Sequence, residues 1–236
     1  MSELVQEGNI FILSIPISFM IPRVEEIHKL LDIVENHEGP TALIITSKHH
    51  KIFSAGMDLK YMQKHGAWTG LSIFSALMGL YGRLLSFKVP TIAALNGHTI
   101  AGGLIFALSV DYRIMARGKF TIKMTELGLG AVIPRGGNVV LSTKLTPSVH
   151  RDLVLRCKEY SCEEALANNI VDELVESQDL MIRARELANE LASLGEKKDV
   201  YICVKKSMYY DTIDINLKAE IKKIEWKIMG KEESKL

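Results

Sequence analysis

The chain has 236 residues, of which 47% are apolar and 24% charged, so it can build a core and is not intrinsically disordered. Its 29 basic and 28 acidic residues leave a net charge of +1, which excludes the strongly basic footprint of a nucleic-acid-binding protein. The three cysteines are too few and too scattered for a disulfide framework, and none forms a C-x-x-C pair.

Strand and helix patterns alternate through the first two thirds of the chain, and helical patterns then take over. Short apolar or β-rich runs predict strands at residues 9–15, 41–46, 89–95, 111–116 and 170–175. Apolar residues at helical spacing, or glycine-opened apolar runs, predict helices at 23–36, from 58 onward, 74–85, 102–109, 180–194, 201–209 and 217–229. A Ser161-x-x-Glu164 capping box predicts one further helix start. This order indicates an α/β fold with a helical C-terminal region, and no repeat or linker divides it.

Two features bear on the compartment of the protein. The longest apolar run, residues 99–110, is well below the roughly 20 residues of a bilayer span, and the acidic N-terminal segment has no secretory pattern. We therefore expect a soluble, intracellular protein without a membrane span. The chain ends Ser234-Lys235-Leu236, the tripeptide that the peroxisomal import receptor reads, so we expect a peroxisomal location and that receptor as a partner.

Several common catalytic signatures are missing from the sequence. It has no P-loop, no G-x-G-x-x-G after a strand, no H-E-x-x-H and no G-x-S-x-G, and its seven histidines do not fall at metal-ligand spacings. We therefore expect no metal site and no nucleotide cradle of these types. Lysines of the predicted C-terminal helices could meet the phosphates of a ligand but are better explained by a solvated helix face; they are Lys205, Lys206, Lys222, Lys223 and Lys227.

Two segments combine a strand, a tight turn and a helix start. Residues 53–59 read Phe-Ser-Ala-Gly-Met-Asp-Leu, where Asp58 can cap the following helix and leave N–H groups around Met57 pointing out of the turn. Residues 96–104 end in Gly102 and Gly103, which open an apolar helix and expose N–H groups at its positive end, a natural oxyanion site. An ordinary capped loop and close helix–strand packing are the alternative explanations.

A third segment carries a single carboxylate. Glu126 stands in the apolar, glycine-rich run 124–130, which closes with Pro-Arg-Gly-Gly at 134–137. In an apolar pocket the pKa of this carboxyl would rise toward working pH, as a general base requires. An exposed or salt-bridged surface glutamate is the alternative.

Together, these segments and their order resemble the crotonase family of enoyl-CoA hydratases and isomerases. The most specific parts are F-S-A-G-M-D-L at 53–59, P-T-I-A-A-L-N-G-H followed by A-G-G within 90–103, and residues 126–137. The resemblance covers residues 10–175 and is weaker in the C-terminal helices. It implies a crotonase-like spiral of β-β-α units at 1–175. It also implies a helical region at 176–236 that helps to form a homotrimer.

The same resemblance implies an acyl-CoA substrate and a set of site residues. The backbone N–H groups of Met57 and Gly102 would hold the thioester oxygen and stabilise an enolate. Contacts with substrate and CoA are expected from Ser54, Ala55, Gly56, Met57, Asp58, Leu59 and Gly102. The size of the acyl pocket is expected to depend on Trp68, Phe74 and Leu77.

The pattern of glutamates suggests the reaction. Hydratases of the family use two glutamates; the later one corresponds to Glu126, but the earlier one corresponds to Ile105, which has no acid–base chemistry. This departure favours a Δ3,Δ2-enoyl-CoA isomerase of peroxisomal fatty acid β-oxidation, with Glu126 as the single acid/base. Such an enzyme needs no metal or redox cofactor, because CoA enters as part of the substrate.

Two other functions stay open at this point. One is a hydratase or dienoyl-CoA isomerase that draws a second acid from residues 61–81; water addition to 2-enoyl-CoA would reveal the hydratase. The other is a non-catalytic acyl-CoA-binding protein, which would bind tightly without turnover. The presence of Gly102, Gly103 and Glu126 argues against the second.

Overall fold

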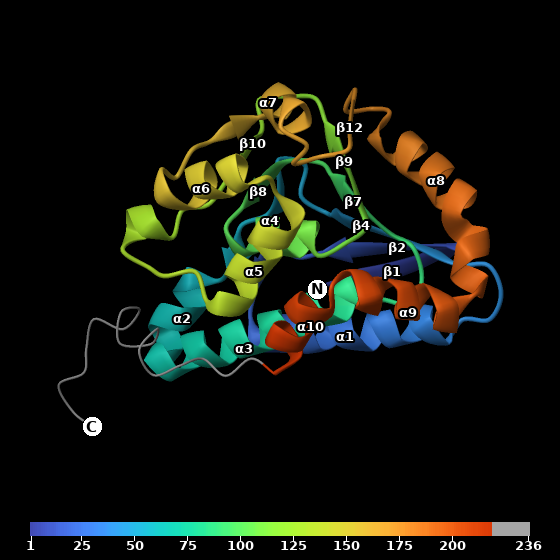
Figure 1. Ribbon diagram of the computed structural model, residues 1–236, viewed down its shortest axis with the longest axis horizontal. Coiled ribbons are helices and arrows are strands. Elements are labelled where there is room, and N and C mark those ends of the chain that lie inside the picture. The colour runs from blue at the N-terminus through green and yellow to red at the C-terminus, as the bar shows by residue number, and fades with distance from the viewer. Residues whose placement is uncertain (219–236) are drawn as a thin grey trace.

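Two β-sheets carry the fold, and helices surround them (Figure 1). The computed structural model describes residues 1–218, apart from the side chains of Ala67 and Trp68. The part of the predicted helix 217–229 beyond residue 218, the terminal Ser234-Lys235-Leu236 and the Trp68 side chain therefore lie outside the described residues.

The larger sheet contains the fully buried strands that the apolar runs predicted. In spatial order it consists of β1 (Glu3–Glu7), β2 (Ile10–Ile15), β4 (Ala42–Ser47), β7 (Thr91–Leu95), β9 (Tyr112–Ala116) and β12 (Glu173–Val175). β1 is antiparallel to β2, and all the other neighbours are parallel. Every residue of β4 and β7 is buried, because helices or the second sheet cover both faces of the larger sheet.

The smaller sheet consists of β11 (Tyr160–Ser161), β10 (Thr121–Lys123), β8 (His98–Ile100) and β5 (Ile52–Ser54), and a separate pair joins β3 (Ser18–Phe19) to β6 (Gly56–Met57). The chain visits the two sheets in turn. β4 is followed by β5, β7 by β8 and β9 by β10, so each turn gives one strand to each sheet before a helix begins. This arrangement confirms the expected crotonase-like spiral of β-β-α units.

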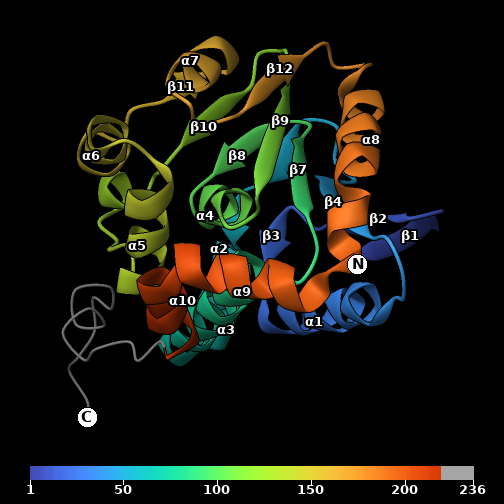
Figure 2. The ribbon, with the colours of Figure 1, turned by 45° about the vertical axis from the view of Figure 1, so that its right-hand side comes forward.

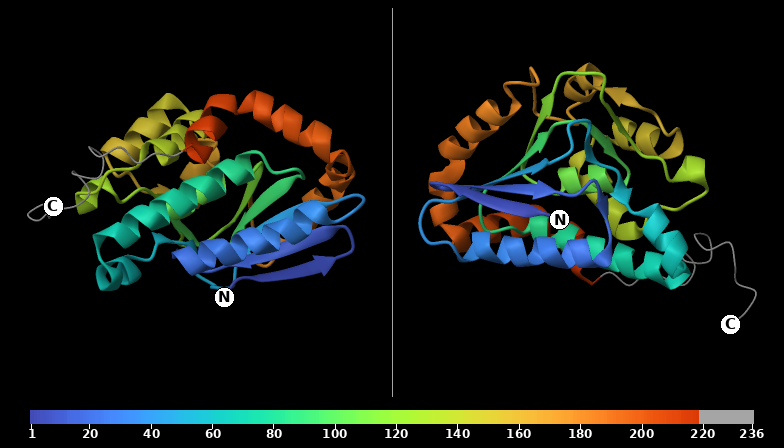
Figure 3. Two further views of the ribbon diagram at one scale, coloured as in Figure 1. Left: turned by 90° about the horizontal axis from the view of Figure 1, so that it is seen from below. Right: turned by 180° about the vertical axis from the view of Figure 1, so that it is seen from behind.

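The helices follow in chain order as α1 (Ile21–Asn36), α2 (Leu59–His65), α3 (Ala67–Leu85), α4 (Gly102–Leu108), α5 (Arg135–Lys144), α6 (Pro147–Leu155), α7 (Cys162–Ala167), α8 (Leu180–Leu191), α9 (Lys198–Met208) and α10 (Tyr210–Leu217). α1 and α3 lie against each other below the sheets (Figure 3). α8 covers the larger sheet with the stripe Leu180, Ala184 and Ala188 (Figure 2). No helix within residues 1–218 is both long and apolar enough to cross a membrane.

The C-terminal helices attach to the spiral through a buried ion pair. Lys205 of α9, expected on a solvated face, is instead only 4% exposed. Its Nζ lies 2.7 Å from Oδ1 of Asp111 and donates to the carbonyl of Leu84. The expectation was wrong because the carboxylate that pairs with Lys205 comes from a distant part of the sequence. The division of the chain at residue 175 stays a prediction.

Most predicted elements are present, with shifted ends. The helix expected at 74–85 begins earlier, at Ala67, and the capping box of Ser161 and Glu164 is formed in full. Several elements had not been predicted, among them the strands β1, β3, β8, β10 and β11 and the helices α5, α6 and α10. β1 is mostly exposed and owes its conformation to pairing with β2, which no local pattern reveals.

Candidate active site

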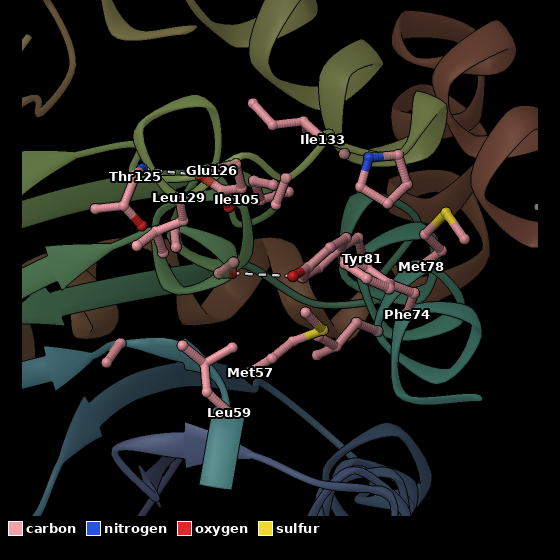
Figure 4. A pocket seen from close by; sticks show the side chains of 17 residues that line it. Met57, Leu59, Phe74, Met78, Tyr81, Ile105, Thr125, Glu126, Leu129 and Ile133 are labelled. Carbon is pink, nitrogen blue, oxygen red and sulfur yellow. Dashed lines mark hydrogen bonds between the residues drawn. The ribbon is translucent and has the colours of Figure 1, made fainter. Parts of the chain in front are cut away.

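An apolar pocket lies between α3, the start of α4 and the segment that follows β10 (Figure 4). Its empty volume, counted out to the open mouth, is about 700 Å³. The lining residues are Ala55, Met57, Leu59, Phe74, Leu77, Met78, Tyr81, Ala101, Gly102, Ile105, Thr125, Glu126, Leu129, Ala131, Ile133, Pro134 and Gly137. Within residues 1–218, Glu126 is the only carboxylate among them, so the pocket combines one acid/base group with apolar walls.

Two glycine-rich segments meet at one side of the pocket. A Cβ atom on Gly56 would lie 2.7 Å from the backbone nitrogen of Gly102, and Gly56 has a φ of +77°. A Cβ atom on Gly103 would lie 2.5 Å from the carbonyl oxygen of Ser54. Only glycine allows this approach, which brings the Met57 backbone and the start of α4 to the same pocket wall.

The start of α4 leaves backbone donors without intrahelical partners. α4 begins at Gly102, and among the described residues no side chain caps it. The first N–H groups of a helix have no acceptor within the helix and lie at its positive end. The preceding residue, Ala101, has a φ of 55° and a ψ of −130°, a conformation that is costly for any residue with a side chain. Strain of this kind persists only where the surroundings hold it.

Ser54 and Asp58 support the turn rather than line the pocket. The Ser54 hydroxyl donates to the carbonyl of Ile17 and accepts from the N–H of Gly56. Asp58 caps α2 by accepting from the N–H of Tyr61 at 3.0 Å, as expected. Partial burial alone would raise the pKa of Asp58, but hydrogen bonds and the charge of Arg23 outweigh it and lower the pKa. Asp58 therefore stays ionised as a helix cap.

Glu126 lies across the pocket from Met57 and Leu59, three residues after the end of β10 (Figure 4). Its Oε2 accepts a hydrogen bond from the N–H of Thr125 at 2.9 Å. Burial among apolar side chains raises the pKa of Glu126, and the backbone hydrogen bonds only partly offset this effect. The alternative of a salt-bridged surface glutamate does not hold, since Glu126 forms no ion pair with any described residue.

α3 contributes one face to the pocket. Phe74, Leu77, Met78 and Tyr81 recur at helical spacing, and all four line it. Phe74 and Leu77 had been expected there. Met78 and Tyr81 had not been singled out, although the same spacing could have indicated them.

Ile105 of α4 also lines the pocket and is 4% exposed. A Cβ atom on Gly137 would lie 2.8 Å from its Cδ1, so the start of α5 packs closely against it. The position that the resemblance assigns to a second glutamate is thus filled by a buried hydrocarbon side chain. No group of three or more His, Cys, Asp or Glu side chains within residues 1–218 could hold a metal ion.

The structure therefore brings seven of the expected residues to one pocket: Ala55, Met57, Leu59, Phe74, Leu77, Gly102 and Glu126. It places Ser54, Gly56 and Asp58 behind the wall, where they shape the turn. Ala131, Ile133, Pro134 and Gly137 also line the pocket. They belong to the segment 126–137 that carries the family resemblance, but the sequence does not reveal where their side chains lie.

Such a pocket, carried on a spiral of two sheets, is the architecture of the crotonase class. The profile of the enoyl-CoA hydratase/isomerase family matches residues 18–234, and the chain belongs to this family. It is 30% identical over 221 residues to a protein named enoyl-CoA delta isomerase 2, peroxisomal, of Arabidopsis thaliana, covering 89% of this chain and 92% of that one. The identity to enoyl-CoA delta isomerase 3 of the same plant is 31% over 219 residues, with the same coverage.

Other relatives carry different activities in their names. A short-chain-enoyl-CoA hydratase of Clostridium acetobutylicum is 30% identical over 170 residues, covering 72% of this chain and 65% of the relative. Among solved structures, an enoyl-CoA hydratase of Mycobacterium ulcerans superposes with a TM-score of 0.83 at 26% identity, covering 93% of this chain and 96% of that one.

Proposed function

We propose that this enzyme is a Δ3,Δ2-enoyl-CoA isomerase, which converts 3-enoyl-CoA to trans-2-enoyl-CoA. The observation that carries the proposal is the pairing of one partly buried carboxylate, Glu126, with an apolar Ile105 in the same pocket. A double-bond shift needs a single group that takes and returns a proton, whereas water addition needs a second group to position water. The isomerase names of two relatives support the same activity.

In the proposed reaction, the Glu126 carboxylate takes a proton from C2 of the bound 3-enoyl thioester. The C2–H electron pair moves into a dienolate, whose negative charge falls on the thioester oxygen. The N–H groups of Met57 and Gly102 hold that oxygen, with the positive end of α4 behind Gly102. Glu126 then returns the proton to C4, which leaves the double bond between C2 and C3.

The environment of Glu126 suits this shuttle. Its raised pKa brings it closer to the pKa of the carbon acid, which makes removal of the C2 proton less unfavourable. Its Oε2 accepts a hydrogen bond from the N–H of Thr125, which holds the carboxylate in position in the pocket. The side chain of Ile105 keeps water from the intermediate, which prevents its hydration.

Location, cofactor need and assembly complete the proposal. The step is a proton transfer within one substrate, so it is written without a metal or redox cofactor. The Ser234-Lys235-Leu236 terminus and the word peroxisomal in one relative's name support import into peroxisomes and a role in fatty acid β-oxidation. We also propose that the enzyme assembles as a homotrimer, as the family resemblance implies.

A substrate panel tests this function. Purified protein is mixed with 3-enoyl-CoA and 2-enoyl-CoA thioesters of several chain lengths, and the absorbance of the conjugated thioester is followed. We expect the absorbance to appear with 3-enoyl substrates and to stay constant with 2-enoyl substrates. Loss of absorbance from 2-enoyl-CoA without turnover of 3-enoyl-CoA would instead identify a hydratase, the second candidate, which the Clostridium relative supports. Tight acyl-CoA binding without any turnover would refute both enzymes.

A further inference from the structure

Tyr81 contributes a buried hydroxyl group to the α3 face of the pocket. The residue is 3% exposed and belongs to the same helical face as Phe74, Leu77 and Met78, which are apolar. A lone hydroxyl among apolar neighbours costs free energy unless it forms a hydrogen bond. The Tyr81 hydroxyl therefore requires a hydrogen-bond partner inside the protein.

The Tyr81 hydroxyl donates to the carbonyl oxygen of Gly102 at 3.0 Å (Figure 4). It also packs tightly there, because a Cβ atom on Gly102 would lie 3.1 Å from the hydroxyl oxygen. The bond joins the C-terminal part of α3 to the first residue of α4. It thus reaches the same residue whose N–H lies at the pocket wall.

The peptide group that carries the Gly102 N–H lies between two fixed neighbours. On one side, the N–H of Ala101 donates to the carbonyl of Lys123 at 2.9 Å. On the other side, the Gly102 carbonyl accepts from Tyr81. Between them, Ala101 has its unfavourable φ of 55°, and its carbonyl accepts from the N–H of Leu104 at 2.9 Å, so these contacts together set the direction of the Gly102 N–H.

We propose that Tyr81 is a positioning residue that aims the Gly102 N–H at the thioester oxygen through its hydrogen bond to the Gly102 carbonyl. This inference rests on the proposed role of Gly102 as an oxyanion donor, but not on which double-bond reaction follows. An oxyanion donor acts only when it points at the developing charge, and a misplacement of about 1 Å can cost about 10²-fold in rate.

The charge state of Tyr81 agrees with a donor role. Burial, and to a smaller extent the negative charge of Glu126, raise the pKa of Tyr81 well above its usual value. The hydroxyl therefore keeps its proton and serves as a hydrogen-bond donor, not as a second acid for water addition.

The variant Tyr81→Phe removes the hydroxyl and keeps the ring. Its matched control is Tyr160→Phe, a buried tyrosine of β11 outside the pocket. Two probes separate positioning from simple packing. Acetoacetyl-CoA forms an enolate whose absorbance reports how strongly the site holds the oxyanion, and butyryl-CoA reports ground-state binding alone. The kcat and KM for 3-enoyl-CoA and the thermal midpoint complete the measurements.

We expect Tyr81→Phe to raise the apparent pKa of bound acetoacetyl-CoA by about one unit and to lower kcat by about tenfold, below the effect of losing a donor outright. Butyryl-CoA affinity and KM should stay within about twofold, as should every value for Tyr160→Phe. Unchanged enolate formation and kcat in Tyr81→Phe would overturn the inference. A parallel loss of butyryl-CoA binding and enolate formation would also overturn it, because that result indicates packing only. If the wild type enolises acetoacetyl-CoA but leaves 3-enoyl-CoA unchanged, the proposed function fails while the enolate measurement still decides the role of Tyr81.

Discussion

Replacing Glu126 with glutamine tests the proton shuttle most directly. Glutamine has the shape of glutamate, and its amide oxygen can still accept from the N–H of Thr125, which lies 2.9 Å from Oε2 in the wild type. The pocket should therefore keep its form while losing its base. Because Glu126 is the only pocket carboxylate within residues 1–218, no described neighbour replaces it. We expect kcat to fall by about 10³ to 10⁴-fold, which corresponds to about 4–5 kcal/mol of activation free energy.

The assay follows the conversion of trans-3-hexenoyl-CoA to its conjugated 2-enoyl isomer, and calorimetry gives the affinity for hexanoyl-CoA. Hexanoyl-CoA affinity should change by less than about threefold, because the substitution removes no oxyanion donor. Glu163→Gln, on an exposed side chain of α7, is the matched control and should leave both values unchanged. Isomerase activity near the wild-type level in Glu126→Gln would refute the reasoning, since it would require a base outside this pocket.

Three further predictions concern pH, packing and stability. Because burial raises the pKa of Glu126 and the base must be ionised, kcat/KM should fall as pH falls through that raised pKa, at higher pH than for an ordinary glutamate; a pH profile measures this. Gly56→Ala places a Cβ 2.7 Å from the start of α4 and should cost about 2–4 kcal/mol in urea unfolding. Gly8→Ala has a φ of 59° but open space, so it should cost only about 1 kcal/mol. Lys205→Met leaves Asp111 buried without its cation and should lower the free energy of unfolding by about 3–5 kcal/mol; an unchanged urea midpoint would contradict this.

The local motifs of the site could be recognised from sequence because their chemistry is local. Asp58 caps α2 by accepting from the Tyr61 N–H, three residues along the chain. The pair of glycines opens α4 as expected, because glycine has no Cβ to obstruct a close approach. Consecutive apolar residues are also a local pattern, and in β4 and β7 they correctly predicted strands that are covered on both faces.

Other features depend on partners that come from far along the chain. The sequence around Lys205 has the pattern of an exposed helix face, yet the Lys205 side chain is buried in an ion pair with Asp111. Tyr81 looks like any tyrosine on an apolar helix until α4 brings the Gly102 carbonyl to its hydroxyl. Neither contact leaves a periodic or spacing signal, because each joins residues that share no local segment.

The sequence by itself determined the alternation of strands and helices, the glycine turns, and the candidate residues Glu126 and Gly102, since spacing and residue chemistry are properties of short segments. Only the tertiary structure decided that these residues share one pocket. It also decided that Ile105 faces that pocket and that burial raises the pKa of Glu126. The physical reason is that desolvation and close packing depend on every segment that surrounds a group, and those segments meet only when the chain has folded.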